Sequence, residues 1–333
     1  MDFSVLSKYR GQLMGIAIVL VALFHSSIVH ANPTIDLVCF VGDMGVDIFF
    51  FLSGMGMFYT YRKDRKTLAF YKKRMVRIIP AWFLVNLYIQ LDQVGFDVTR
   101  LNPVSFVKYM TGFSFWLEGN LYFWYIPAAL AFYAMTPAFM WLYKKNKKQA
   151  YAIFSIIWMG LVGVSILVQN ASYFIFLFRW PVFFLGILFG DFSYQKKKIK
   201  KAYVIPVIIV LILGLVMENT IRMYNGRMGI RYDYKYFIYV MISIPICLVL
   251  TLAMEKMKYS FGILRLLGNI TLEIYLLHEY ILRKVTMWIG TVPFDSLGIV
   301  FNVFIFLATA GVAWVLHVIL SKAIGCFKMC HEG

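Results

Sequence analysis

The chain has 333 residues, of which 61% are hydrophobic and 15% charged, and its mean hydropathy is +0.74. A soluble domain carries about 25% charged residues, so the composition excludes a soluble globular protein and indicates a polytopic membrane protein. The net charge of +17 lies in short basic clusters between apolar runs. Such clusters are typical of membrane topology signals, and we predict no nucleic-acid partner.

Ten segments are apolar enough to be membrane spans, which need about 20 residues each. The first is interpreted as a span and not as a cleaved signal peptide, because no small-residue cleavage site follows it. Pro80 fits the first turn of the third span, which is short. The predicted spans are residues 12–30, 38–61, 78–91, 121–143, 150–168, 173–192, 202–217, 236–254, 270–289 and 297–320.

Threading ten spans places every Lys and Arg cluster on the same side of the membrane. The positive-inside rule makes this side, and both termini, cytoplasmic. We therefore predict an all-α bundle of about ten transmembrane helices in the plasma membrane, forming a single domain over residues 1–333. The clusters are Lys8 with Arg10, and residues 62–77, 144–148, 196–201, 256–265 and 322–328.

His25 follows ten apolar residues in the outer half of the first span. An ionisable side chain inside a span is costly and usually functional. A neutral imidazole there can take a proton from a hydroxyl group. The alternative interpretation is a structural histidine that is satisfied by a neighbouring helix.

Asp47 is the predicted partner of His25. The turn between the first two spans is short, so both residues are expected at similar depth near the outer face. Asp47 could then orient the imidazole, as an acidic residue does in catalytic triads. Asp43 is a competitor that we expect to be more solvated. Glycines in the same segment permit close helix packing: Gly42, Gly45, Gly54 and Gly56.

Arg74 and Arg77 are three residues apart, just before the third span. Two arginines on one helical face at a membrane entrance form a suitable fork for phosphates. Coenzyme A carries a pyrophosphate and a 3′-phosphate, and its flexible arm can bring a thioester into the bilayer. Ordinary positive-inside charge is the alternative interpretation.

Arg179 interrupts a strongly apolar stretch and is expected to face the bundle interior or a cavity. Further along the chain, Tyr275 and His278 share a helical face, and Glu273 lies on the same segment. We predict that these residues line one cavity. The sequence shows no metal-ligand cluster, and we predict no metal cofactor.

Six blocks of this sequence, in order, resemble the membrane acyltransferase-3 family of bacterial O-acyltransferases. The resemblance implies a ten-span fold, a cytoplasmic acyl-CoA donor, most simply acetyl-CoA, and transfer to a hydroxyl of a cell-envelope or secreted saccharide. The blocks are MGIAIVLVALFHS (14–26), GVDIFFFLSG (45–54), FYKKRMVRIIPAW (70–82), WYIPAALAFYAMTP (124–137), FRWPVFFLGILFG (178–190) and LGNITLEIYLLHEY (267–280).

In this resemblance His25 matches the family's first-span histidine, and Arg74 with Arg77 matches its RxxR pair. The chain departs from the family at two positions. Met14 stands where the family has an arginine, and Arg10, one turn earlier on roughly the same face, is expected to substitute for it in holding coenzyme A. Ala129 stands where many members have a glutamate.

The sequence thus predicts a membrane O-acyltransferase whose partners are acyl-CoA, a saccharide acceptor and the lipid bilayer. The alternative from a different class is a transporter or flippase for a saccharide or small acid, because a similar cavity with arginines and a histidine would serve translocation. The oligomeric state does not follow from the sequence.

Overall fold

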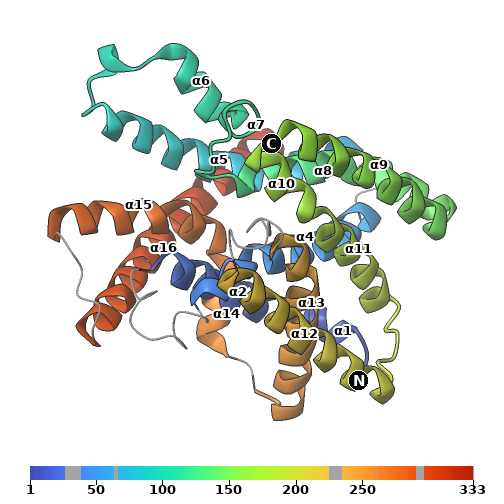
Figure 1. The fold of residues 1–333 in the computed structure, drawn as a ribbon. Helices are drawn as coiled ribbons and strands as arrows, with labels where there is room; N and C mark the ends of the chain where they lie inside the picture. The colour runs from blue at the N-terminus through green and yellow to red at the C-terminus, as the bar shows by residue number, and fades with distance from the viewer. Residues whose placement is uncertain (27–38, 64–66, 225–234, 260, 290–295, 333) are drawn as a thin grey trace.

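The computed structural model describes residues 1–26, 39–63, 67–224, 235–259, 261–289 and 296–332 (Figure 1). Within these residues the regular structure is helical, apart from an isolated bridge between Asp2 and Lys198. The prediction of an all-α polytopic bundle is therefore confirmed.

Each predicted span falls on a helical segment, and the sixth is divided into two helices at Arg179. Of the described helices, seven are long and apolar enough to cross a membrane. Helices α2, α5 and α15 are too short or too polar by that measure, so the count of ten remains a prediction. The helices at the predicted spans are α2 (Arg10–His25), α4 (Met44–Lys63), α5 (Thr67–Gln93), α8 (Tyr125–Lys145), α9 (Lys147–Val168), α10 (Ala171–Phe178), α11 (Trp180–Tyr194), α12 (Val204–Met223), α13 (Lys235–Met257), α15 (Thr271–Ile289) and α16 (Ser296–Glu332).

Shorter helices connect the long ones. Helices α6 (Pro103–Thr111) and α7 (Phe113–Glu118) lie between α5 and α8, and α6 starts where the Asn102 side chain accepts a hydrogen bond from the Ser105 backbone N–H at 3.1 Å. Helix α1 (Ser4–Lys8) precedes α2, and α14 (Gly262–Asn269) packs against α2. Single 3₁₀ turns occupy Val98–Arg100 and Lys201–Tyr203.

Helices α2 and α4 lie at the centre of the bundle (Figure 1), and glycines let their neighbours approach closely. A Cβ atom on Gly54 of α4 would lie 2.1 Å from the Phe183 carbonyl of α11, and one on Gly186 would lie 2.2 Å from the Phe51 carbonyl. A Cβ on Gly45 would lie 2.4 Å from the Ala17 carbonyl of α2. The predicted packing role of these α4 glycines is confirmed, because any larger residue would push the helices apart.

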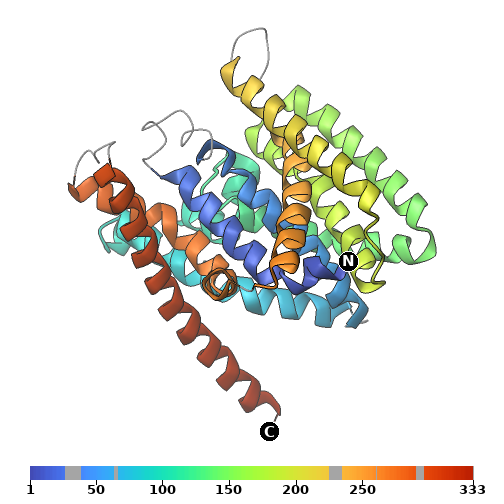
Figure 2. The same cartoon turned by 90° about the horizontal axis from the view of Figure 1, so that it is seen from below.

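Helices α9 and α12 lie at the periphery and expose mainly apolar side chains, as surfaces facing lipid do. Helix α16 runs along one flank, and its last turns extend past the rest of the bundle (Figure 2).

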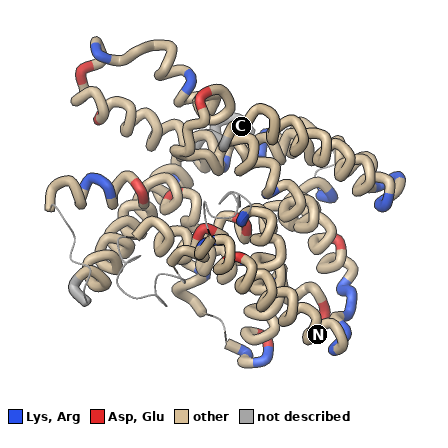
Figure 3. Tube along the Cα trace, in the orientation of Figure 1, with Lys and Arg blue, Asp and Glu red and all other residues tan. Residues whose placement is uncertain are grey.

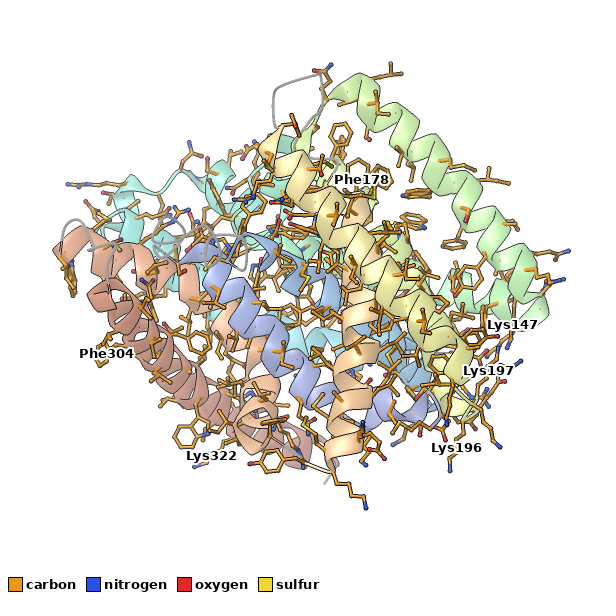
Figure 4. All side chains as sticks on the ribbon, turned by 60° about the horizontal axis from the view of Figure 1, so that its bottom comes forward. Lys147, Phe178, Lys196, Lys197, Phe304 and Lys322 are labelled. Carbon is orange, nitrogen blue, oxygen red and sulfur yellow. The ribbon has the colours of Figure 1, made fainter. Side chains whose placement is uncertain are left out.

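The basic residues gather towards the ends of the helices (Figure 3). Lys147, Lys196, Lys197 and Lys322, which come from three different loops or ends, lie along the same edge of the bundle (Figure 4). The N-terminus is at this edge too, because the Phe3 backbone N–H donates to the Lys197 carbonyl at 3.0 Å. The arrangement agrees with basic clusters on one side, and the cytoplasmic identity of that side remains a prediction.

Candidate functional site

A large cavity lies at the C-terminal end of α2, where His25 is the last helical residue. Its volume is about 850 Å³, and its lining includes four residues that the sequence singled out, namely His25, Arg179, Tyr275 and His278. The structure therefore brings together residues from α2, the α10–α11 junction and α15. We call this space the outer cavity. Its other polar or aromatic lining residues include Asp43, Gln90, Asp92, Asn120, Tyr122, Trp124, Tyr236, Glu279, Tyr280, Arg283 and Lys284.

His25 and His278 are in direct contact within the outer cavity. Their ring centroids are 4.9 Å apart at an interplanar angle of 70°, an edge-to-face arrangement. His25 is the last residue of α2 and is half-buried, whereas His278 is buried in α15. The Nδ1 atom of His278 lies 2.8 Å from the Tyr275 carbonyl oxygen one turn earlier. The pair is thus held by the end of one helix and the wall of another.

Asp47 makes no hydrogen bond to His25 in the described part of the chain. It is fully buried, and the Nε atom of Arg179 lies 3.5 Å from its Oδ2 atom. Asp43, which we expected to be more solvated, is also buried and lines the outer cavity with His25. The expected position of Asp47 next to the imidazole is therefore corrected: depth along the span was judged from the short turn, but the direction of the side chain brings it to Arg179.

The positive charges of Arg179 and Lys235 balance the negative charges of Asp43 and Asp47. The Arg179 Nη2 atom is 3.6 Å from Asp43 Oδ1, and the Lys235 Nζ atom is 2.9 Å from Asp43 Oδ2. The Arg179 guanidinium also lies over the rings of Trp124 and Tyr236, at 4.5 Å and 4.2 Å from their centroids. We call Asp43, Asp47, Arg179 and Lys235 the buried ion cluster. Sequence reasoning missed Lys235, because a lysine just before an apolar run resembles an ordinary flanking charge.

A second cavity, of about 200 Å³, holds Arg10, Arg74 and Arg77. Its lining, among the described residues, contains these three arginines and no carboxylate. Arg10 Nε donates to the Leu52 carbonyl at 3.2 Å, and Arg74 Nη2 donates to the Thr60 hydroxyl. We call this space the basic cavity.

Two residues explain how Arg10 reaches the basic cavity. A Cβ atom on Gly56 would lie 3.2 Å from Arg10 Nη2, so the glycine leaves room for the guanidinium. Met14, at the position of the family's arginine, lines the same cavity as Arg10. The structure therefore puts a guanidinium in this space from one turn earlier on α2.

The basic cavity lies between two other spaces. On one side it shares Arg10, Gly11 and Asn269 with a cavity of about 700 Å³ whose lining also includes basic side chains. On the other side it shares Tyr275 with the outer cavity. The Tyr275 hydroxyl accepts a hydrogen bond from the Tyr125 backbone N–H at 3.2 Å. Three cavities thus follow one another through the bundle. The basic residues of the first are Lys8, Arg10, Lys258 and Arg265.

Glu273 does not line the outer cavity. Its Oε1 atom lies 2.8 Å from Nδ1 of His317 on α16, so this pair links α15 to α16. The sequence assigned no role to His317, and no spacing rule connects two residues on different helices. Within the described part of the chain, no group of three or more His, Cys, Asp or Glu residues is placed to hold a metal ion. The side chains of Cys326, Cys330 and His331 lie outside the described residues.

A family model described as an acyltransferase domain matches residues 13–318. The chain therefore belongs to the acyltransferase-3 family of membrane acyltransferases. Comparisons with curated proteins and with solved structures gave no significant match.

Proposed function

We propose that the protein is a membrane O-acyltransferase that moves an acyl group, most simply acetyl, from cytoplasmic acyl-CoA to a hydroxyl of a cell-envelope or secreted saccharide. Family membership supports acyl transfer. The donor, the acceptor and the plasma-membrane location are part of the proposal.

The observation that carries the proposal is that three cavities adjoin one another, with arginines in the basic cavity in the middle and histidines in the outer cavity. Phosphates and a thioester sit at opposite ends of coenzyme A. Arg10 and His25 lie at opposite ends of α2, and a helix of 16 residues spans about 24 Å. A donor held by its phosphates at Arg10, Arg74 and Arg77 must therefore extend past Tyr275 to present its thioester to His25.

The proposed chemistry at His25 is proton transfer. The imidazole takes the proton of the acceptor hydroxyl while the hydroxyl oxygen attacks the thioester carbonyl carbon. The C–S bond breaks, the coenzyme A thiolate leaves, and the proton passes from His25 to the sulfur. A relay of the acyl group through His25 gives the same net reaction. Asp47 acts on this chemistry only through Arg179 and the buried ion cluster.

The outer cavity has a lining suited to a saccharide. Trp124, Tyr122, Tyr236 and Tyr280 offer aromatic faces, and amide and carboxylate side chains such as Gln90 and Asn120 offer hydrogen bonds. Arg179 lines the same space while it is engaged with the aspartates, so we propose that it shapes the cavity.

The first experiment measures coenzyme A released from acetyl-CoA by purified protein, without and with saccharide acceptors. We expect His25→Ala to reduce release at least about 100-fold, the lower limit for loss of a general base. His317→Ala is the matched control, because it removes a histidine outside the cavities. Retained activity in His25→Ala would refute the assignment of His25 as the general base. Substrate uptake into vesicles without any acyl transfer would instead support the transporter alternative.

A further inference from the structure

We infer that His278 is a positioning residue for His25, because the two rings are in edge-to-face contact and Nε2 of His278 is buried without a hydrogen-bond partner among the described residues. The inference rests on the proposed role of His25 as the base. It concerns which nitrogen of His25 faces the saccharide hydroxyl.

The tautomer of His278 follows from its contact with the backbone. A carbonyl oxygen only accepts hydrogen bonds, so the nitrogen that lies 2.8 Å from the Tyr275 carbonyl must carry the proton. In the neutral ring the other nitrogen, Nε2, then has a free lone pair. Nε2 is buried, and it has no hydrogen-bond partner among the described residues. A buried acceptor without a partner is costly, so a donor is expected close by.

His25 is the donor that the geometry favours. Its ring is in edge-to-face contact with that of His278, with the ring centroids 4.9 Å apart, and a neutral imidazole carries one N–H that can donate to Nε2. His278 also lines a mainly apolar cavity of about 130 Å³. Three other polar residues line it: Ser26 donates to the Leu23 carbonyl, Asn302 donates to the Gly298 carbonyl, and Thr309 has a buried hydroxyl that is a possible competitor.

In this arrangement His278 orients the His25 imidazole, which is the role that was predicted for Asp47. When one nitrogen of His25 donates to His278, the other nitrogen is left as the acceptor, facing the substrate, as in a triad whose third member fixes the tautomer. Of the nearby carboxylates, Asp43 and Asp47 are held by Arg179 and Lys235, and Glu279 is paired with Arg283. A neutral histidine therefore takes the place of a charged partner beside His25.

The test compares two substitutions of similar size at His278. In His278→Gln the side-chain oxygen replaces Nε2 as the acceptor, whereas His278→Leu has none. We expect His278→Leu to lower kcat about 10–100-fold, the range for removing the orienting partner of a metal-ligating histidine. We expect an unchanged KM for acyl-CoA and recovery of most of kcat in His278→Gln.

Two control variants separate orientation from packing and from the competing donor. Thr309→Val removes the other hydroxyl near His278, and His317→Gln makes the glutamine change at a histidine outside the outer cavity; both are expected to keep wild-type kcat. The inference is overturned if His278→Leu retains full kcat, if Leu and Gln lose kcat equally, or if Thr309→Val reproduces the loss.

A second measurement does not depend on activity. In ¹⁵N spectra of histidine-labelled protein, the signals that His278→Leu removes should show the proton on Nδ1, and those of His25, assigned with His25→Ala, should shift in the same variant. A proton on Nε2 of His278 would overturn the inference even in an active enzyme. Absence of coenzyme A release by wild-type protein, with the expected spectra, would refute the proposed function and leave the histidine contact supported.

Discussion

The buried ion cluster and the basic cavity both bring arginines into the bundle, and the two regions are built differently. In the buried ion cluster, Arg179 and Lys235 face two aspartates at 2.9–3.6 Å, so the charges balance within the protein. In the basic cavity, three arginines line a space whose described lining has no carboxylate. The first region satisfies its own charge, while the second is suited to receive negative charge from outside.

Inside this membrane protein, a structural arginine and a binding arginine differ in the charges that surround them. Burial differs between them, because Arg179 is fully buried, whereas Arg10 and Arg74 are half-buried and Arg77 is exposed. The balance of charge in the lining distinguishes their roles, since a charge taken from water must be paired by the protein or by a ligand. The two regions should therefore respond differently to the loss of an arginine.

The largest expected effect is on stability, from Arg179→Met. This variant leaves Asp47 buried without its cation, and removing one partner of a buried ion pair costs about 3–5 kcal/mol. The melting temperature in detergent should fall sharply. The double variant Arg179→Met with Asp47→Leu removes one charge of each sign and should recover most of the loss. If the double variant is as unstable as the single one, the ion pair is not what Arg179 provides. Arg100→Met, in an exposed pair with Asp97, is the control.

The next effect is on substrate affinity, from Arg74→Ala with Arg77→Ala. Each hydrogen bond to a charged group contributes about 1.5–3 kcal/mol, so we expect the KM for acyl-CoA to rise at least about tenfold. The KM for the acceptor and the melting temperature should change little. Lys72→Ala with Lys73→Ala, two exposed neighbours outside the cavity lining, is the matched control. A change confined to acceptor kinetics would contradict the phosphate assignment.

The smallest effect is expected from Asp47→Asn. The amide keeps an acceptor near Arg179, and Asp43 remains beside the guanidinium. The rate of acyl transfer should fall less than in His25→Ala, with a modest loss of melting temperature. Equal loss of rate in the two variants, at unchanged melting temperature, would place Asp47 in the chemistry and weaken the comparison.

Sequence periodicity was sufficient for the helices and for the shared face of Tyr275 and His278, because both depend on residues close in the chain. It also predicted a buried Arg179, since a charge in an apolar run has few other places to go. The pairing of Asp47 with Arg179, of Asp43 with Lys235, and of Glu273 with His317 joins residues far apart in the chain. Such contacts depend on how helices rotate about their axes, which a hydropathy pattern does not define.

The position of the arginines relative to the histidines has an electrical consequence for the proposed reaction. Moving one elementary charge across a membrane at 100 mV changes its energy by about 2.3 kcal/mol. In the proposed arrangement the phosphates remain at Arg10, Arg74 and Arg77, and only the uncharged thioester end passes Tyr275. Acyl transfer then carries no net charge through the transmembrane field, and its rate is independent of the membrane potential.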